Sequence, residues 1–219
     1  MRIVIIGAGG HAHVIADGIL RRQERDASIS LLGFVDDRAS IRGELILGFP
    51  VLGALSDLSA IPHDGVVVAV GDNQARAQIF AQLHQQRETP VNVIHPASII
   101  APDVRLGVGV MICAGVVVNS GSVIGDNVIL NTGCTVDHHN QIGAHVHIAP
   151  GVHLAGNVHI NTGVFVGIGA SVIPSRVVGD WAIVGAGAVV TTDVPPWTTN
   201  VGVPARTITS REGHEKKAA

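Results

Sequence analysis

Residues 123–148 read VIGDNVILNTGCTVDHHNQIGAHVHI, with an aliphatic side chain at positions 124, 130, 136, 142 and 148. The same sixfold spacing runs without interruption from Ile94 to Val190, over 17 positions. A period of six fits neither an α-helix, with about 3.6 residues per turn, nor a free strand, with a period of two. The spacing indicates a β-helix, in which each repeat buries its apolar face only against the neighbouring coils.

Three repeats make one triangular coil, so residues 18 positions apart lie in one column along the coil axis. The side chain four positions after each aliphatic residue is small or β-branched in most repeats, and the exceptions are Asn140 and Arg176. This regularity argues against a β-sandwich, whose strands and loops vary in length.

The first 92 residues follow a different pattern. Apolar runs at residues 2–6, 30–35 and 65–70 alternate with helix-length segments at residues 11–22 and 73–86, and residues 91–94 close the series. Strands that alternate with helices indicate a parallel sheet. We expect a small Rossmann-like α/β domain over residues 1–92, a parallel β-helix with a C-terminal extension over residues 93–209, and a flexible tail over residues 210–219.

The composition excludes several classes of protein. A net charge of −3 provides no basic surface for nucleic acid or an anionic membrane. No apolar run approaches the ~18 residues that span a bilayer, and the apolar run at the start is too short for a signal peptide. The sequence therefore predicts a cytoplasmic protein. Cys113 and Cys134 form neither a disulfide framework nor a metal-binding motif.

A glycine-rich turn, Gly7-Ala-Gly-Gly-His-Ala12, separates the first predicted strand from the first predicted helix. Glycines at this place let backbone N–H groups approach a phosphate at the helix N-terminus. A dinucleotide needs two mononucleotide-binding halves, and the short N-terminal region provides one, which suits a single nucleotide. The alternative is a tight turn that binds nothing.

The hexapeptide repeat and its end, GAGAVV at residues 185–190, resemble those of the hexapeptide-repeat acyltransferases. The segments GAGGHA at 7–12, GFVDD at 33–37, GDNQAR at 71–76 and VIHP at 93–96 narrow the resemblance to bacterial nucleotide-sugar N-acetyltransferases related to sialic-acid O-acetyltransferases. The resemblance covers nearly the whole chain. It implies a left-handed β-helix, a homotrimer, and transfer of acetyl from acetyl-CoA to the amine of a nucleotide-linked amino sugar in surface-glycan or glycoprotein synthesis.

The same resemblance places the general base at His138, within residues 131–139. An imidazole, with a reference pKa near 6.5, can accept the proton of an attacking amine at neutral pH. Gly156 lies one coil further along this column, leaves room for the ring, and would offer its N–H to the thioester oxyanion. Relatives carry an acid directly after the histidine, whereas here His139 follows it and Asp137 precedes it, so the orienting partner stays open.

The resemblance also implies further contacts with both substrates. Gly9, Gly10 and His11 would contact the phosphates or the sugar, Asp36 and Asp37 the nucleoside, and Asn131 the sugar. His147 would contact acetyl-CoA bound with the neighbouring protomer. Ile168 and Ala186, in one column with Pro150, would line the pantetheine groove. The nucleotide stays open among UDP, GDP and dTDP.

Three other functions are alternatives to an amino-sugar N-acetyltransferase. Gamma-class carbonic anhydrases are also β-helix trimers, but their zinc ligands need histidine spacings that are not present between residues 95 and 159, so we expect no metal. A sialic-acid-type sugar O-acetyltransferase would use a hydroxyl acceptor. A non-catalytic sugar-nucleotide-binding protein would keep the fold, and His139 in place of the acid leaves that reading open.

Overall fold

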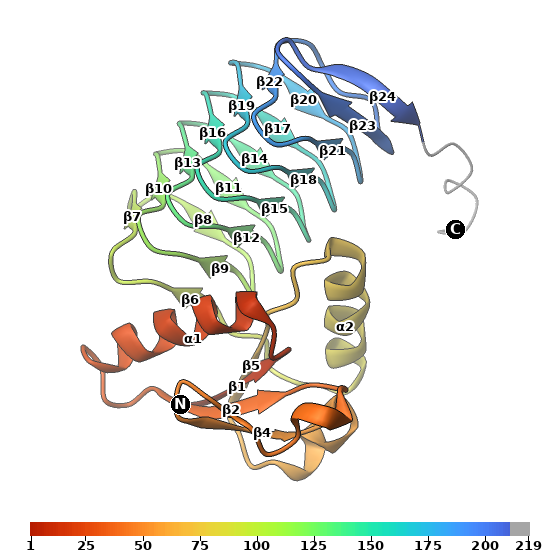
Figure 1. Ribbon diagram of the computed structural model, residues 1–219. Coiled ribbons are helices and arrows are strands. Elements are labelled where there is room, and N and C mark those ends of the chain that lie inside the picture. The colour runs from red at the N-terminus through yellow and green to blue at the C-terminus, as the bar shows by residue number, and fades with distance from the viewer. Residues whose placement is uncertain (211–219) are drawn as a thin grey trace.

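We describe a computed structural model of the chain, which covers residues 1–210. The small N-terminal domain lies at one end of a long coil that rises away from it (Figure 1). Of the predicted tail at residues 210–219, Ser210 belongs to the last strand, and residues 211–219 lie outside the described residues. No helix within residues 1–210 is both long and apolar enough to cross a membrane.

The N-terminal sheet has the strand order β3-β4-β2-β1-β5, and its strands are parallel except for the β3–β4 hairpin. Side chains alternate between its two faces, and Ile3 and Ile5 pack with one helix while Val4 and Ile6 pack with the other. The strands are β1 (Arg2–Ile6), β2 (Ser30–Val35), β3 (Leu45–Ile46), β4 (Phe49–Gly53) and β5 (Gly65–Val68). The helices are α1 (Gly10–Gln23), α2 (Asn73–Gln85) and the short 3₁₀ helices η1 (Ala39–Ile41) and η2 (Leu55–Ala60).

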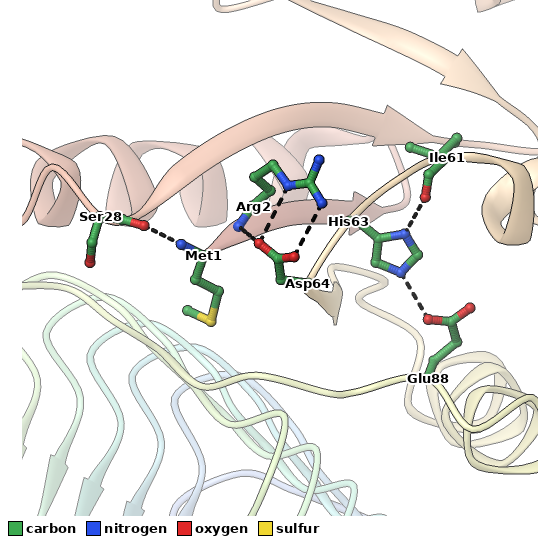
Figure 2. Close-up of polar contacts among 7 residues, drawn as sticks. All are labelled: Met1, Arg2, Ser28, Ile61, His63, Asp64 and Glu88. Atoms are coloured by element: carbon green, nitrogen blue, oxygen red, sulfur yellow. Dashed lines mark hydrogen bonds and ion pairs between the residues drawn. The ribbon is translucent and has the colours of Figure 1, made fainter.

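Polar contacts join chain segments at the end of this sheet where its strands begin (Figure 2). The carboxylate of Asp64 accepts hydrogen bonds from the backbone and guanidinium of Arg2, and the N-terminal amine donates to the carbonyl of Ser28. His63 bonds the carboxylate of Glu88 through Nε2 at 2.8 Å. The glycine-rich turn lies at the opposite end of the sheet, where the strands end.

The C-terminal part is a left-handed parallel β-helix with three flat faces, as the spacing and the resemblance predict. Strands 18 residues apart pair in register, for example Val117 with Thr135. The first face contains β6 (Val93–Ile94), β9 (Met111–Ile112), β12 (Ile129–Leu130), β15 (His147–Ile148), β18 (Phe165–Val166) and β21 (Ile183–Val184). The second face contains β7 (Ile99–Ile100), β10 (Val117–Val118), β13 (Thr135–Val136), β16 (His153–Leu154), β19 (Ser171–Val172) and β22 (Val189–Val190).

The third face contains β8 (Arg105–Leu106), β11 (Val123–Ile124), β14 (Gln141–Ile142), β17 (His159–Ile160) and β20 (Val177–Val178). Every coil has the same length, so the turns stack into three continuous edges. After the last coil, β23 (Thr198–Val201) continues the first face in parallel, and β24 (Arg206–Ser210) pairs with β23 in the antiparallel direction. Both strands begin within the region predicted to form the C-terminal extension.

The N-terminal domain packs on the first face of the β-helix. The Asn73 side chain donates to the carbonyls of Gly163 and Val164 at 3.0 and 2.9 Å. The core that α1 shares with the sheet is continuous with the core of the β-helix. The two domains therefore form one packed unit through this face.

One expectation for the N-terminal domain differs from the structure, and one of its elements was not predicted. Residues 91–94 do not close its sheet, because Val93 and Ile94 pair with Met111 and Ile112 of the β-helix. At the N-terminal sheet, Pro90 forms an isolated bridge with Val66, and the Val91 N–H donates to the Val66 carbonyl at 2.9 Å. The β3–β4 hairpin was not predicted, because residues 45–53 form a nearly continuous apolar run with no period of two.

Candidate active site

His138 lies on the turn that joins β13 to β14, at the edge between the second and third faces. The buried Asn140 fixes this turn, because its side-chain amide donates to the carbonyl of Asp137 at 2.6 Å and its Oδ1 accepts from the N–H of Val158 at 2.7 Å. Ser122 also donates to the Asp137 carbonyl, at 2.9 Å. A buried polar group inside an apolar coil thus holds an exposed histidine in place.

The imidazole of His138 rests against Gly156 in the next coil. A Cβ at Gly156 would lie 2.4 Å from Cε1 and 2.6 Å from Nε2 of His138, which is too close for any side chain. The missing side chain at position 156 therefore creates the space in which the ring lies, with Nε2 beside the backbone of Gly156.

The neighbours of His138 have separate roles. Its Nδ1 lies 3.0 Å from Nδ1 of His139. The carboxylate of Asp137 instead accepts from the His138 backbone N–H at 2.8 Å and from the side chain of Asn119 at 3.0 Å. These bonds, the first above all, hold the pKa of the Asp137 carboxyl below its usual value. Asp137 therefore stabilises the turn, and His139 is the group that meets the ring nitrogen.

The glycine-rich turn lies at the edge of the N-terminal sheet where β1, β2 and β5 end. A side chain at Gly9 or Gly10 would contact nothing, so the turn is open to solvent. The carboxylate of Asp36 accepts from the Ala8 N–H at 2.8 Å and pairs with Arg38. The hydrogen bond from Arg38 is the largest of the effects that lower the pKa of Asp36 to about 2.

A cavity of about 190 Å³ opens beside this turn, with apolar walls and two carboxylates at its rim. Asp37 accepts a hydrogen bond from the Leu55 N–H at 2.9 Å through Oδ1. A flat ring fits between apolar walls, and carboxylate oxygens can accept from its N–H groups. The residues that line the cavity are Ile6, Gly7, Val35, Asp36, Asp37, Leu55, Val70 and Ile79.

A second cluster lies where the two domains meet. The rings of His11 and His147 are 5.9 Å apart, and Asn131 Nδ2 lies 3.1 Å from Nε2 of His147. Burial, together with the charge of Arg76, lowers the pKa of His11 to about 4 and that of His147 to about 3. Both rings are therefore neutral at physiological pH. Nε2 of His11 is buried and has no hydrogen-bond partner among the described residues.

Arg76, which the sequence analysis did not single out, is fully buried beneath this cluster. Its guanidinium donates to the carbonyls of Val70 in the N-terminal domain and of Asn127 and His145 in the β-helix, at 3.0, 3.3 and 2.7 Å. Burial lowers the pKa of Arg76 to about 10, which leaves it charged at neutral pH. This charge adds to the effect of burial, which is the larger cause of the lowered pKa values of the two neighbouring imidazoles.

The expected pantetheine column follows the edge between the first and second faces. Ile168 is 58% exposed and Ala186 is also exposed, whereas Pro150 is half-buried. The N–H groups of Gly169 and Gly187 bond the carbonyls of Pro150 and Ile168, so the edge is a regular ladder with an apolar surface.

Comparison with known proteins places this geometry in a family. Residues 2–83 match the family model described as the PglD N-terminal domain. PerB from Caulobacter crescentus, crystallised with CoA and GDP-perosamine, is 38% identical, and the match covers 95% of this chain and 98% of PerB with a TM-score of 0.87. The chain belongs to the hexapeptide-repeat sugar N-acetyltransferases.

Two other members of this family are equally similar in fold. The acetyltransferase domain of PglB from Neisseria gonorrhoeae FA1090 is 36% identical, with 94% of this chain and 99% of that chain covered and a TM-score of 0.88. WeeI from Acinetobacter baumannii AYE is 29% identical, with 95% and 100% covered and a TM-score of 0.85. No curated protein matches the sequence significantly.

Like the other hexapeptide-repeat sugar N-acetyltransferases, the chain is an acyltransferase. Within residues 1–210, no three histidine, cysteine, aspartate or glutamate side chains are grouped so that they could hold a metal ion. The buried Cys113 and Cys134 have their pKa values raised to about 12 by burial, so neither thiol is a nucleophile in the folded chain.

In this family member, the expected site residues form two groups that do not meet within one chain. Gly9, Gly10, His11, Asn131 and His147 lie around the first face, where the N-terminal domain packs. His138 lies on the edge opposite that face. Sequence reasoning missed Arg76 and Asn140 as supports, although Asn140 was visible as an exception to the repeat.

Proposed function

We propose that the chain transfers the acetyl group of acetyl-CoA to the amine of a nucleotide-linked amino-deoxy sugar, with His138 as the general base. The observation that carries this proposal is the exposed imidazole of His138, which rests against Gly156 so closely that an added Cβ there would lie 2.6 Å from Nε2. PerB, which is 38% identical, was crystallised with CoA and GDP-perosamine. Variants of that enzyme with one histidine replaced by asparagine or alanine were crystallised with the same two ligands.

The proposed reaction balances as an acyl transfer. The sugar amine attacks the thioester carbonyl, and the C–S bond breaks as the amide C–N bond forms. Nε2 of His138 accepts the proton that the amine loses and delivers it to the departing sulfur, which leaves as the CoA thiol. The Gly156 N–H is the proposed donor to the carbonyl oxygen, whose charge increases in the transition state.

The sugar nucleotide has its proposed site in the N-terminal domain. The cavity beside Asp36 and Asp37 has the size and chemistry for one base, and the turn at Gly9 and Gly10 lies next to it for the diphosphate. His11, Asn131 and His147 lie at the domain junction, in the direction that the sugar would extend. Neutral imidazoles at this place can hydrogen-bond a sugar hydroxyl without repelling the amine when it is protonated.

The separation of the two groups supports a site shared between subunits. Sugar bound at the first face of one chain cannot reach His138 on the opposite edge of the same chain. A neighbouring copy in a trimer would bring its His138 to that sugar, with the apolar edge at Ile168 as the place for pantetheine. Ile99 and Ile168 are 68% and 58% exposed, which suits burial against a second copy.

Acetylation of purified sugar nucleotides tests the proposal. GDP-perosamine is the first substrate to use, followed by UDP- and dTDP-linked 4-amino sugars, with free CoA thiol and the acetylated product both measured. We expect turnover by the wild type and a loss of about 10²–10⁴-fold in His138→Ala, with His153→Ala as a matched exposed control. Turnover of a hydroxyl acceptor in place of every amine would instead indicate an O-acetyltransferase. Binding without turnover would indicate a sugar-nucleotide-binding protein.

A further inference from the structure

The contact between two histidine rings is the feature that the proposed function does not explain. Nδ1 of His138 and Nδ1 of His139 are 3.0 Å apart, and the rings meet edge to face with centroids 5.2 Å apart. A hydrogen bond between two such nitrogens needs one that carries a proton and one that does not. We infer that His139 is the positioning residue of the general base, and that it accepts the proton of His138 Nδ1. This inference rests on the proposed function.

The backbone and a glycine place His139 for this role. His139 has a φ of +57°, in the left-handed region, as does Asn157 in the same column, and its ring meets that of the preceding residue edge to face. Its ring lies over Gly121 in the coil below, where a Cβ would be 2.7 Å from Cδ2 and 3.0 Å from Nε2. Gly121 therefore makes space for His139 in one direction along the coil axis, and Gly156 makes space for His138 in the other.

Asp103 favours the tautomer that this role needs. It lies two coils below His139 in the same column, and its carboxylate accepts from Ser120 Oγ and from the Gly121 N–H, both at 2.8 Å. These bonds, and more weakly the charge of His139, lower the pKa of Asp103. A negative charge on this side of the ring favours a proton on Nε2 of His139, which leaves its Nδ1 free to accept.

The tautomer of His138 follows from that arrangement. When its Nδ1 donates to His139, the lone pair is on Nε2, beside Gly156, where the amine proton would arrive. The reverse hydrogen bond would put the proton on Nε2 and prevent general-base catalysis. His139 and Asp103 together therefore select the form of His138 that can react.

Two carboxylates lie near the pair, Asp137 on the same turn and Asp103 two coils below, and the Asp137 carboxylate is bonded to the His138 backbone and to Asn119. The coil above presents Gly156 and Asn157, which carry no charge. A neutral acceptor at position 139 stabilises the protonated base less than a carboxylate would.

Three substitutions at position 139 separate positioning from structure. Glycine, asparagine and aspartate all tolerate the left-handed backbone of this residue. His139→Gly removes the acceptor, His139→Asn puts Oδ1 where Nδ1 lies, and His139→Asp puts a carboxylate oxygen there. All three retain His138, Gly156 and the Asn140 anchor.

Steady-state kinetics against pH, with acetyl-CoA and the accepted sugar nucleotide, give the first readout. We expect His139→Gly to lower kcat by about 10–100-fold with KM within about threefold, a part of what a general base supplies. His139→Asn should recover most of that loss. His139→Asp should move the acid limb of kcat/KM to higher pH by about one unit.

The ¹⁵N chemical shifts of the His138 ring, measured without substrate, give a readout independent of activity. We expect a protonated Nδ1 in the wild type and a mixture of tautomers in His139→Gly. Wild-type kcat and pH profile in His139→Gly would overturn the inference, as would a proton on Nε2 of His138 in the wild type. If the wild type acetylates no sugar nucleotide, the proposed function fails, and the ring shifts still decide the tautomer.

Discussion

The ring of His138 lies so close to the α-carbon of Gly156 that no methyl group fits between them. A Cβ at position 156 would lie 2.4 Å from Cε1 of the ring, so we expect Gly156→Ala to displace the imidazole. The alanine N–H stays in place, and the exposed ring can move away without unfolding the coil. We predict a fall in kcat of about 10²-fold, measured by acetyl transfer.

A double-substitution cycle shows whether that loss comes from the ring. Gly156→Ala should have almost no further effect in a His138→Ala background, because the displaced group is already absent. Equal losses from Gly156→Ala in both backgrounds would instead place its effect on the backbone. Thermal unfolding of each variant checks that the coil remains folded.

The burial of His147 leads to a prediction of how the free energy of unfolding depends on pH. Burial, with the charge of Arg76, lowers its folded-state pKa to about 3, whereas an unfolded histidine titrates near 6.5. Between these values the unfolded chain binds the extra proton, so stability falls as the pH decreases from about 6.5 towards 3. His11, with a pKa near 4, acts in the same direction.

Urea unfolding of His147→Gln measures that contribution. The loss of stability between pH 7 and pH 5 should be smaller in this variant than in the wild type, by up to about 2 kcal/mol. His153→Gln, at an exposed position on the second face, should retain the wild-type slope. If the free energy of unfolding of His147→Gln depended on pH as that of the wild type does, the His147 ring would not be held neutral in the folded chain.

At the scale of elements, the buried Arg76 of α2 joins the two domains, alongside Asn73 of the same helix. The guanidinium of Arg76 donates to carbonyls of both domains, including those of Val70 and His145, and the side chain is fully buried. We predict that Arg76→Met lowers the free energy of unfolding by about 2–4 kcal/mol, because several buried acceptors lose their donor. Trp181 and Trp197, both in the β-helix, report its unfolding by fluorescence.

Far-UV circular dichroism followed in the same experiment detects separation of the two domains. In Arg76→Met we expect the helical signal of α1 and α2 to be lost before the tryptophan signal. Arg21→Met, on the exposed face of α1, is the matched control and should unfold as the wild type does. Coincident transitions and wild-type stability in Arg76→Met would contradict the role of Arg76 as the link between the domains.

The elements differ in how far the sequence determines them. The β-helix was predictable because each sixth residue must be buried, which leaves one register for the whole column, and the same spacing places Gly156 beside His138. The β3–β4 hairpin was not, because an apolar run without alternation does not show where a chain turns. The burial of Arg76 was not predictable either, since its acceptors are backbone carbonyls of another domain and leave no mark on side-chain patterns.

At the scale of the whole molecule, the glycine-rich turn and His138 lie apart in one chain. We therefore predict that two inactive variants, one altered at each place, regain activity when they assemble together. Gly9→Asp puts a carboxylate at the first position before α1, where it suits the helix but repels a diphosphate. His138→Ala removes the base. If each site uses the turn of one chain and the histidine of another, a mixed trimer contains one intact site, or about one third of full activity.

Unfolding and refolding the two variants together, then measuring acetyl transfer, tests this arrangement. Refolding each variant alone supplies the background rate, which should stay low. If the mixture is no more active than the separate variants, each site is contained within one chain. Light scattering of the same samples gives the number of chains per particle.

The ends of the β-helix have a consequence for the behaviour of the chain at high concentration. A stack of parallel coils offers unpaired backbone groups at its first and last rungs, which could recruit further chains into a fibre. Here α1 packs against β6 at the first rung, and the antiparallel β24 lies along β23 at the last. On the first face the stack thus ends in elements that break its repeat, which opposes the addition of further chains along that face.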